Sequence, residues 1–165
     1  MGVWRVRGLI TAPLTQVWEF IIDPRNMHLW GPLTEPVTGI DRPLQLGDRV
    51  IQRRRRFFRR ARQDLLVEEI VPYRSFRLRI LSPSGRPMNA TATVSVEEAA
   101  EPGATRIEEA IAYSLGNGPI TRWVDRWLVY PLFLWVVRRA STRAFGRLAA
   151  NLSHGHEGGE AAPSA

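Results

Sequence analysis

The chain opens with a stretch in which apolar and polar side chains alternate, over residues 3–10. A period of two is typical of a strand with one buried face. A helix is predicted next, over residues 13–22, because its apolar residues recur at a spacing that puts them on one face. We expect Thr11 to cap this helix, and Pro13 suits its first turn, where a missing N–H is harmless.

A second, shorter helix is predicted directly after the first. Asp23-Pro24 ends the first helix, since a residue before proline is disfavoured in the α-helical region. Asp23 can then cap a short helix that runs to Trp30, and Gly31-Pro32 ends that helix.

The segment from residue 34 to residue 115 has the pattern of strands separated by turns. The predicted strands are residues 34–40, 49–56, 60–71, 75–81, 88–96 and 105–115. One long helix is predicted over residues 120–152, with a kink at Pro131. This order predicts an α+β fold, in which an antiparallel sheet of about seven strands packs against a helix roughly 45 Å long. We expect residues 3–152 to form one domain and the polar tail, residues 153–165, to be disordered.

The composition excludes several classes of protein. With 165 residues, 44% of them hydrophobic and 24% charged, the chain suits one globular domain. It has no Cys, which excludes disulfides, thiolate nucleophiles and Cys-ligated metals. The longest apolar run, residues 127–137, is far shorter than the roughly 20 residues of a membrane-spanning helix. Residues 1–7 lack the apolar core of a signal peptide, and we expect a cytoplasmic protein.

All 23 basic residues are arginines, and with 16 acidic residues the net charge is +7. Seven of these arginines stand within the run Arg53 to Arg62, around Phe57 and Phe58. Such a run could contact an anionic membrane surface or, as the less favoured reading, a nucleic acid. The alternative is a solvated pair of strands whose arginines meet nearby acids, namely Asp64, Glu68 and Glu69.

Alternation on the later strands predicts which side chains face the interior. In residues 75–81 the inward face is apolar and the outward face carries arginines. On the next strand the inward set includes Ala90 and Ala92, which remove side-chain volume where the long helix is expected to cross. Close packing would favour larger residues there, so the two alanines indicate a hollow for a ligand, unless Trp123 or Trp127 fills it.

Glu109 is the charged residue that alternation places on an apolar face, together with Ile107, Ile111 and Tyr113. Burial there would raise the pKa of the carboxyl group unless an arginine pairs with it. The carboxylate could accept a hydrogen bond from a ligand hydroxyl or act as a proton acceptor in a cyclase. The alternatives are an interior ion pair and a bulge that returns Glu109 to solvent.

An opening motif is formed by residues 10–13 (Ile-Thr-Ala-Pro), 17–21 (Val-Trp-Glu-Phe-Ile) and 23–27 (Asp-Pro-Arg-Asn-Met), followed by Trp30. Leu46-Gly47-Asp48 and residues 103–107 (Gly-Ala-Thr-Arg-Ile) stand later in the chain. These features resemble the START/Bet v 1-like (SRPBCC) superfamily, and most closely its bacterial polyketide cyclase/dehydrase-like branch, over residues 3–152. The resemblance implies a helix-grip fold, in which a curved antiparallel sheet wraps a long helix around a deep apolar cavity. Members include lipid and sterol carriers, quinone-binding proteins and aromatase/cyclases, so the fold alone does not identify the activity.

From the resemblance and the alternation together we expect a ligand cavity, with His28 near its mouth. The residues expected to line it are Trp30, Phe76, Leu78, Ile80, Asn89, Ala90, Ala92, Val94, Glu109, Ile111, Tyr113, Trp123, Trp127 and Leu134. Glu109 and Tyr113 are the catalytic candidates if the protein is an enzyme. No cofactor is expected. No metal site is expected either, because the two histidines of the tail, His154 and His156, are too few ligands and have no rigid scaffold.

The predicted function is binding or carriage of a small hydrophobic ligand that is lipid-like, aromatic or polyketide-like. The alternative is a polyketide aromatase/cyclase that uses the cavity carboxylate. Residues 127–137 have more apolar perimeter than one sheet can cover. This excess indicates a homodimer through the C-terminal helix, contact with a membrane surface, or burial under the two short helices.

Overall fold

The structure is a computed structural model, described over residues 2–30, 37, 39–56, 59–82, 86–113 and 145–152, with the backbone alone for residues 52–56 and 59–63. The first part of the chain forms β1 (Gly2–Ile10), α1 (Leu14–Ile22), a short 3-10 helix, η1 (Pro24–Asn26), and α2 (Met27–Trp30). The strands that follow are β2 (Arg49–Arg56), β3 (Arg59–Val71), β4 (Ser75–Leu81), β5 (Pro87–Glu98) and β6 (Thr105–Tyr113). Residues 145–152 are helical.

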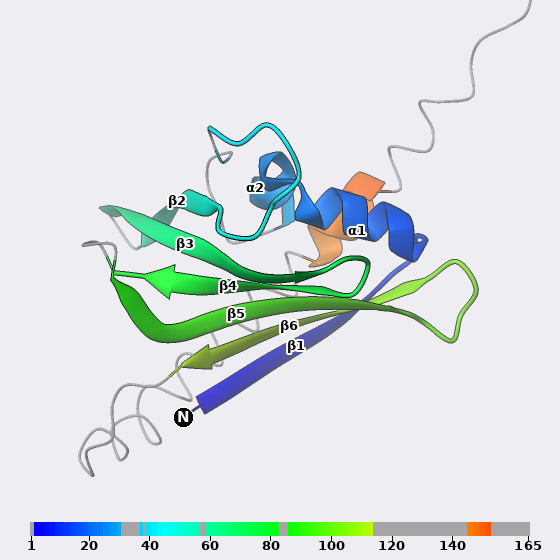
Figure 1. The fold of residues 1–165 in the computed structure, drawn as a ribbon. Helices are drawn as coiled ribbons and strands as arrows, with labels where there is room; N and C mark the ends of the chain where they lie inside the picture. The colour runs from blue at the N-terminus through cyan, green and yellow to red at the C-terminus, as the bar shows by residue number, and fades with distance from the viewer. Residues whose placement is uncertain are drawn as a thin grey trace, which may run out of the picture.

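The six strands form one sheet in the order β1-β6-β5-β4-β3-β2, and every neighbouring pair is antiparallel. Figure 1 shows the sheet curving, with α1 and α2 lying over one of its faces. We call this the concave face, because the buried core lies between it and the helices. The predicted antiparallel α+β class is confirmed.

The predicted strand over residues 34–40 is wrong for the residues described in it. Val37, Gly39 and Ile40 are not in a strand, so the described sheet has six strands instead of about seven. Gly39 has a φ of 88°, which is a left-handed conformation that interrupts an extended chain. Val37 is nonetheless buried in the core, which explains its apolar side chain.

The starts of the two N-terminal helices differ in how well the sequence predicts them. Pro13 is the residue before α1, and no side chain caps that helix, so the predicted cap at Thr11 is wrong. Thr11 instead lies in the turn between β1 and α1, where Ala12 N–H donates to the carbonyl of Ile10 at 2.9 Å. The predicted cap at Asp23 is confirmed, since its carboxylate accepts the backbone N–H of Arg25 at 2.9 Å.

The helical segment 145–152 packs against the sheet through one face. Phe145, Leu148 and Leu152 are buried and belong to the same core as the concave-face side chains. Their spacing of three and four residues is that of one helix stripe. This part of the predicted C-terminal helix is confirmed, while residues 120–144, including Pro131, lie outside the described residues.

The opposite face of the sheet, which we call the convex face, carries paired charges. Ion pairs join Arg77 to Glu69 and Arg79 to Glu68 between β4 and β3. The arginines of residues 75–81 therefore face outward as predicted, while Phe76 and Leu78 are buried on the concave face. No helix in the described part of the chain is long and apolar enough to cross a membrane.

Candidate functional site

A row of five side chains crosses the middle of the concave face. The register aligns Trp4, Ile111, Ala92, Leu78 and Val67 on adjacent strands, from β1 to β3. Trp4, Leu78 and Val67 are buried, while Ala92 and Ile111 are half-buried. The row therefore contains one small side chain, at Ala92, between neighbours that are all large.

The neighbouring row contains the carboxylate of Glu109. The register pairs Glu109 with Val6 on β1 and with Val94 on β5, and Val94 is paired in turn with the fully buried Phe76. Glu109 is half-buried. The pairing of β6 with both of its neighbours is continuous through Glu109, which excludes the bulge that would have turned this side chain to the convex face.

Two further residues predicted for the site, Ala90 and Tyr113, form a third row. Tyr113 pairs with Ala90, and Tyr113 is buried while Ala90 is half-buried. Ile80, half-buried on β4, faces the same side as Leu78. The structure therefore brings Phe76, Leu78, Ile80, Ala90, Ala92, Val94, Glu109, Ile111 and Tyr113 to one face of the sheet.

Asn89 does not lie with these residues. It stands between Met88 and Ala90 on β5 and is exposed. Because side chains alternate along a strand, the position next to Ala90 points to the convex face. Its inclusion among the lining residues is therefore a wrong prediction, and its polar character reflects contact with water.

Two candidates come from the short helices. Trp30 ends α2 and is 5% exposed. His28 is half-buried, and its Nδ1 atom lies 2.7 Å from the carbonyl oxygen of Arg25, so the ring is tied to η1. Trp123, Trp127 and Leu134 lie outside the described residues, and their part in the site stays a prediction.

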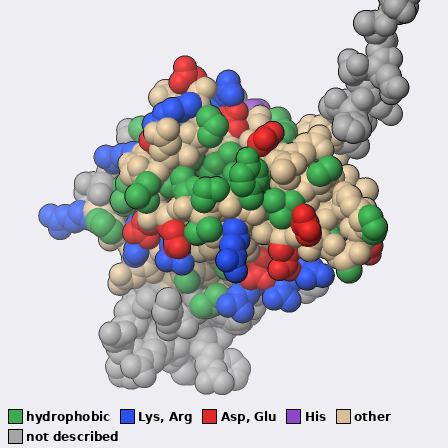
Figure 2. Space-filling view, turned by 45° about the vertical axis from the view of Figure 1, so that its right-hand side comes forward, with side chains coloured by type: hydrophobic (Ala, Val, Ile, Leu, Met, Phe, Trp, Pro, Cys, Tyr) green, Lys and Arg blue, Asp and Glu red, His purple; other side chains and the backbone are tan. Residues whose placement is uncertain are grey.

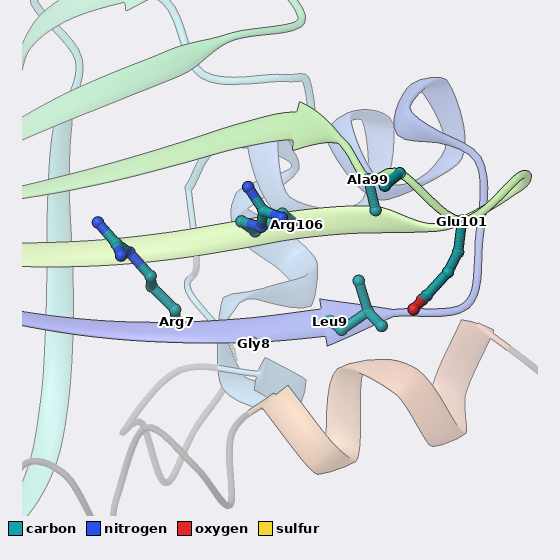
Figure 3. Close-up of a pocket in the computed structure, with 7 residues that line it drawn as sticks. Arg7, Gly8, Leu9, Ala99, Glu101 and Arg106 are labelled. Carbon is teal, nitrogen blue, oxygen red and sulfur yellow. The ribbon is translucent and has the colours of Figure 1, made fainter.

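A hollow of about 350 Å³ lies at the edge of the sheet, away from the predicted site (Figure 3). It is lined by Arg7, Gly8, Leu9, Ala99, Ala100, Glu101 and Arg106. Both guanidinium groups have carboxylate partners: Arg7 bonds to Glu108 at 2.5 Å and Arg106 to Glu97 at 2.8 Å. The hydrogen bond with Glu108 raises the pKa of Arg7. Since these charges are already neutralised, the hollow is a poor site for an anion.

A second hollow, of about 280 Å³, lies between α1 and the turn from β3 to β4. Its lining includes Trp18 and Tyr73, whose ring centroids are 6.0 Å apart. Tyr73 has a φ of 57°, which is uncommon for a residue other than glycine. Figure 2 shows hydrophobic side chains gathered near the middle of one face, with charged side chains around them. Sequence reasoning identified neither hollow, because each forms where segments distant in the sequence meet.

The arginine run occupies the paired ends of β2 and β3. The register sets Arg53 opposite Arg62 and Arg55 opposite Arg60. The side chains of the run lie outside the described ones, so a role in binding a membrane surface or nucleic acid stays a prediction. The ion pairs described for the acids near it reach arginines outside the run: Asp64 pairs with Arg49, Glu68 with Arg79 and Glu69 with Arg77.

The fold and the row of side chains over its concave face define a helix-grip α+β protein. The family described as polyketide cyclase / dehydrase and lipid transport matches residues 4–153, and the chain belongs to this family. The resemblance seen in the opening motif is therefore confirmed. No curated protein matches the chain.

Solved structures share the fold at low sequence identity. Protein Ms6760 from Mycobacterium smegmatis is 21% identical, with a TM-score of 0.66, and the match covers 93% of this chain and 92% of that one. Protein SA2116 from Staphylococcus aureus, of unknown function, is 10% identical, with a TM-score of 0.70 and coverage of 94% and 96%. DynU16, from the dynemicin biosynthetic locus, is 19% identical, with a TM-score of 0.61, and the match covers 93% of this chain but 48% of DynU16.

Proposed function

We propose that the concave face binds and carries a small hydrophobic ligand. The observation that carries this proposal is the half-buried Ala92 in a row whose other members are Trp4, Ile111, Leu78 and Val67. A core selected for close packing alone would have a large side chain at this central position. Membership of a family that includes lipid transport supports the same conclusion.

The chemistry of the face agrees with an apolar ligand. The side chains around Ala92 are aliphatic or aromatic, and the neighbouring row adds one carboxylate, Glu109. Ligand sites are usually apolar walls with a few polar groups that orient the ligand. Selectivity then comes from the shape of the face and from where those polar groups stand.

Native mass spectrometry of the protein purified from the organism that encodes it tests this function. We expect a complex with one ligand, which an organic solvent extracts from the denatured protein. A protein that carries no ligand, and that also fails to bind aromatic or fatty-acyl probes in titration calorimetry, would contradict the proposal.

A second candidate function is that of a polyketide aromatase/cyclase, and the position of Glu109 favours it. The carboxylate stands on the concave face between Val6 and Val94. There it can remove a proton from a carbon that lies between two carbonyl groups of a linear polyketone. That carbon then bonds to a distant carbonyl carbon, and the carbonyl oxygen recovers the proton from Glu109.

The variant Glu109→Gln separates the two functions, because it keeps the shape of the side chain and removes the base. A cyclase would keep its affinity for a polyketone analogue and lose turnover, measured as the amount of cyclised product separated by chromatography. A carrier would show no turnover in either form of the protein.

We infer further that residues 3–152 form the binding domain, which the family match over residues 4–153 supports. We also propose a cytoplasmic location, because residues 1–7 lack the apolar core of a signal peptide. The apolar residues 127–137 support a homodimer through the C-terminal helix. Sedimentation at micromolar concentration, with and without anionic liposomes, tests the dimer. A monomer that does not bind liposomes would contradict the dimer and mean that residues 127–137 are buried within their own chain.

A further inference from the structure

The indole N–H of Trp30 is a hydrogen-bond donor buried in the core. The side chain is 5% exposed, and its Nε1 atom is buried without a hydrogen-bond acceptor among the described residues. The indole N–H can only donate, so the atom cannot be satisfied by a neighbouring N–H group. Buried donors in folded proteins are almost always paired, and each exception calls for an explanation.

Two other buried polar side chains of the described core have hydrogen-bond partners. Thr105 is fully buried, and its hydroxyl donates to the carbonyl of Ala12 at 2.7 Å. Asp64 is buried, and its carboxylate accepts two hydrogen bonds from Arg49, at 2.5 and 3.1 Å. The indole N–H of Trp30 differs from these two groups in having no partner among the described residues. A phenylalanine at this position would supply apolar surface without the cost of an unpaired donor.

The position of Trp30 connects this donor with the ligand-binding face. Trp30 lies at the end of α2, and its side chain belongs to the same core as Val50, Leu65 and Leu78 of the concave face. Figure 1 shows α2 on the side of the sheet where that core lies. A ligand held against the concave face would therefore lie against the same core as the indole.

We propose that the indole N–H of Trp30 donates a hydrogen bond to a neutral carbonyl oxygen of the ligand. This inference rests on the proposed function and narrows the ligand to an apolar molecule that carries a carbonyl group. A carboxylate fits less well, because one neutral donor does not compensate the burial of a full charge. A ketone, a quinone and an ester share the required acceptor.

Fluorenone and fluorene are probes that test this bond, since they share a ring system and differ by one carbonyl oxygen. Titration calorimetry should show that the wild-type protein binds fluorenone more tightly than fluorene, by roughly two- to tenfold. The variant Trp30→Phe keeps an aromatic ring and removes the donor, so it should bind the two probes equally. The matched control is Trp18→Phe, which changes another buried tryptophan, on α1, and should keep the preference for fluorenone.

A second measurement uses the wild-type protein and does not depend on whether the variant folds. In a proton–nitrogen correlation spectrum, the indole N–H proton of Trp30 should move downfield with fluorenone and not with fluorene. Suppose that both probes bind without any preference for fluorenone that Trp30→Phe removes, and without a shift of the indole proton specific to fluorenone. That result would contradict the hydrogen bond from Trp30 and leave the proposed function standing. If neither probe binds the wild-type protein, the carrier function fails for aromatic ligands, and this inference fails with it.

Discussion

The ring of Phe145 lies directly on the backbone of Gly8, at a point where a Cβ atom on Gly8 would come within 2.6 Å of Phe145 Cδ2. Gly8 is in β1, and Phe145 belongs to the helical segment 145–152. The contact therefore fixes how closely the end of the chain approaches the first strand. It also explains why a residue with low strand propensity stands inside β1.

The variant Gly8→Ala should be less stable than the wild-type protein. The added methyl group must displace the buried ring of Phe145, and overpacking of this kind costs about 1–3 kcal/mol of unfolding free energy. This cost exceeds the gain of up to about 1 kcal/mol that alanine ordinarily brings over glycine. Urea unfolding measures the change, and the second substitution Phe145→Leu should recover part of the loss. A Gly8→Ala variant that is more stable than the wild type would show that the helix does not press on β1.

The hydroxyl of Thr105, at the start of β6, donates a hydrogen bond to the carbonyl of Ala12, two residues before the start of α1. Thr105→Val should lower the unfolding free energy by about 2 kcal/mol, because it leaves a buried carbonyl without this donor. Thr105→Ser keeps the hydroxyl and loses one methyl group, so it should cost about 1 kcal/mol. Equal stability of the valine variant and the wild-type protein would mean that the bond contributes nothing.

Asp48 should make the protein sensitive to acid. Its carboxylate accepts hydrogen bonds from both terminal nitrogens of Arg42, at 2.7 and 2.8 Å, and from the backbone N–H of Gln45. The bonds with Arg42 are the main cause of the lowered pKa of Asp48, and the bond from Gln45 adds to it. A carboxyl group with a lowered folded-state pKa stabilises the protein above its unfolded pKa, and this contribution is lost as the pH falls through the folded value.

We therefore expect Asp48→Asn to melt at a lower temperature than the wild-type protein at neutral pH. The difference should shrink as the pH falls from about 4, the usual pKa of an aspartate in the unfolded chain, through the lower pKa of Asp48 in the folded protein. Thermal melts across the acid range measure this convergence. A constant difference between Asp48→Asn and the wild type would show that ionisation of Asp48 is not involved.

Sequence reasoning succeeded where the signal is local. Polar and apolar residues alternate over residues 75–80, and the strand predicted over residues 75–81 matches β4, as the strand predicted over residues 49–56 matches β2. The same alternation predicted that Glu109 faces the core side of the sheet, which the continuous register of β6 confirms. Asn89 shows the limit of choosing residues by polarity, because the alternation that turns Ala90 inward turns its neighbour outward.

The features that escaped prediction depend on contacts between distant segments. The hollow at Arg7 and Arg106 forms where the connection between β5 and β6 lies beside β1, about ninety residues away in sequence. The lack of an acceptor for the indole N–H of Trp30, among the residues that the structure describes, is visible only once the surroundings of α2 are known. Neither has a sequence signature, because hollows and hydrogen-bond partners are properties of the packed structure.

The most direct test of the binding face compares two phenylalanine substitutions on neighbouring residues of β5. Ala92 lies in the central row of the concave face, whereas Thr93 lies on the convex face, paired with Arg77 and Ala110. Titration of both folded variants with fluorenone should show that Ala92→Phe weakens binding by about tenfold or more, because the added ring occupies the ligand's volume. Thr93→Phe should bind as the wild-type protein does. Unchanged binding by a folded Ala92→Phe variant would contradict the proposal that the ligand occupies the concave face.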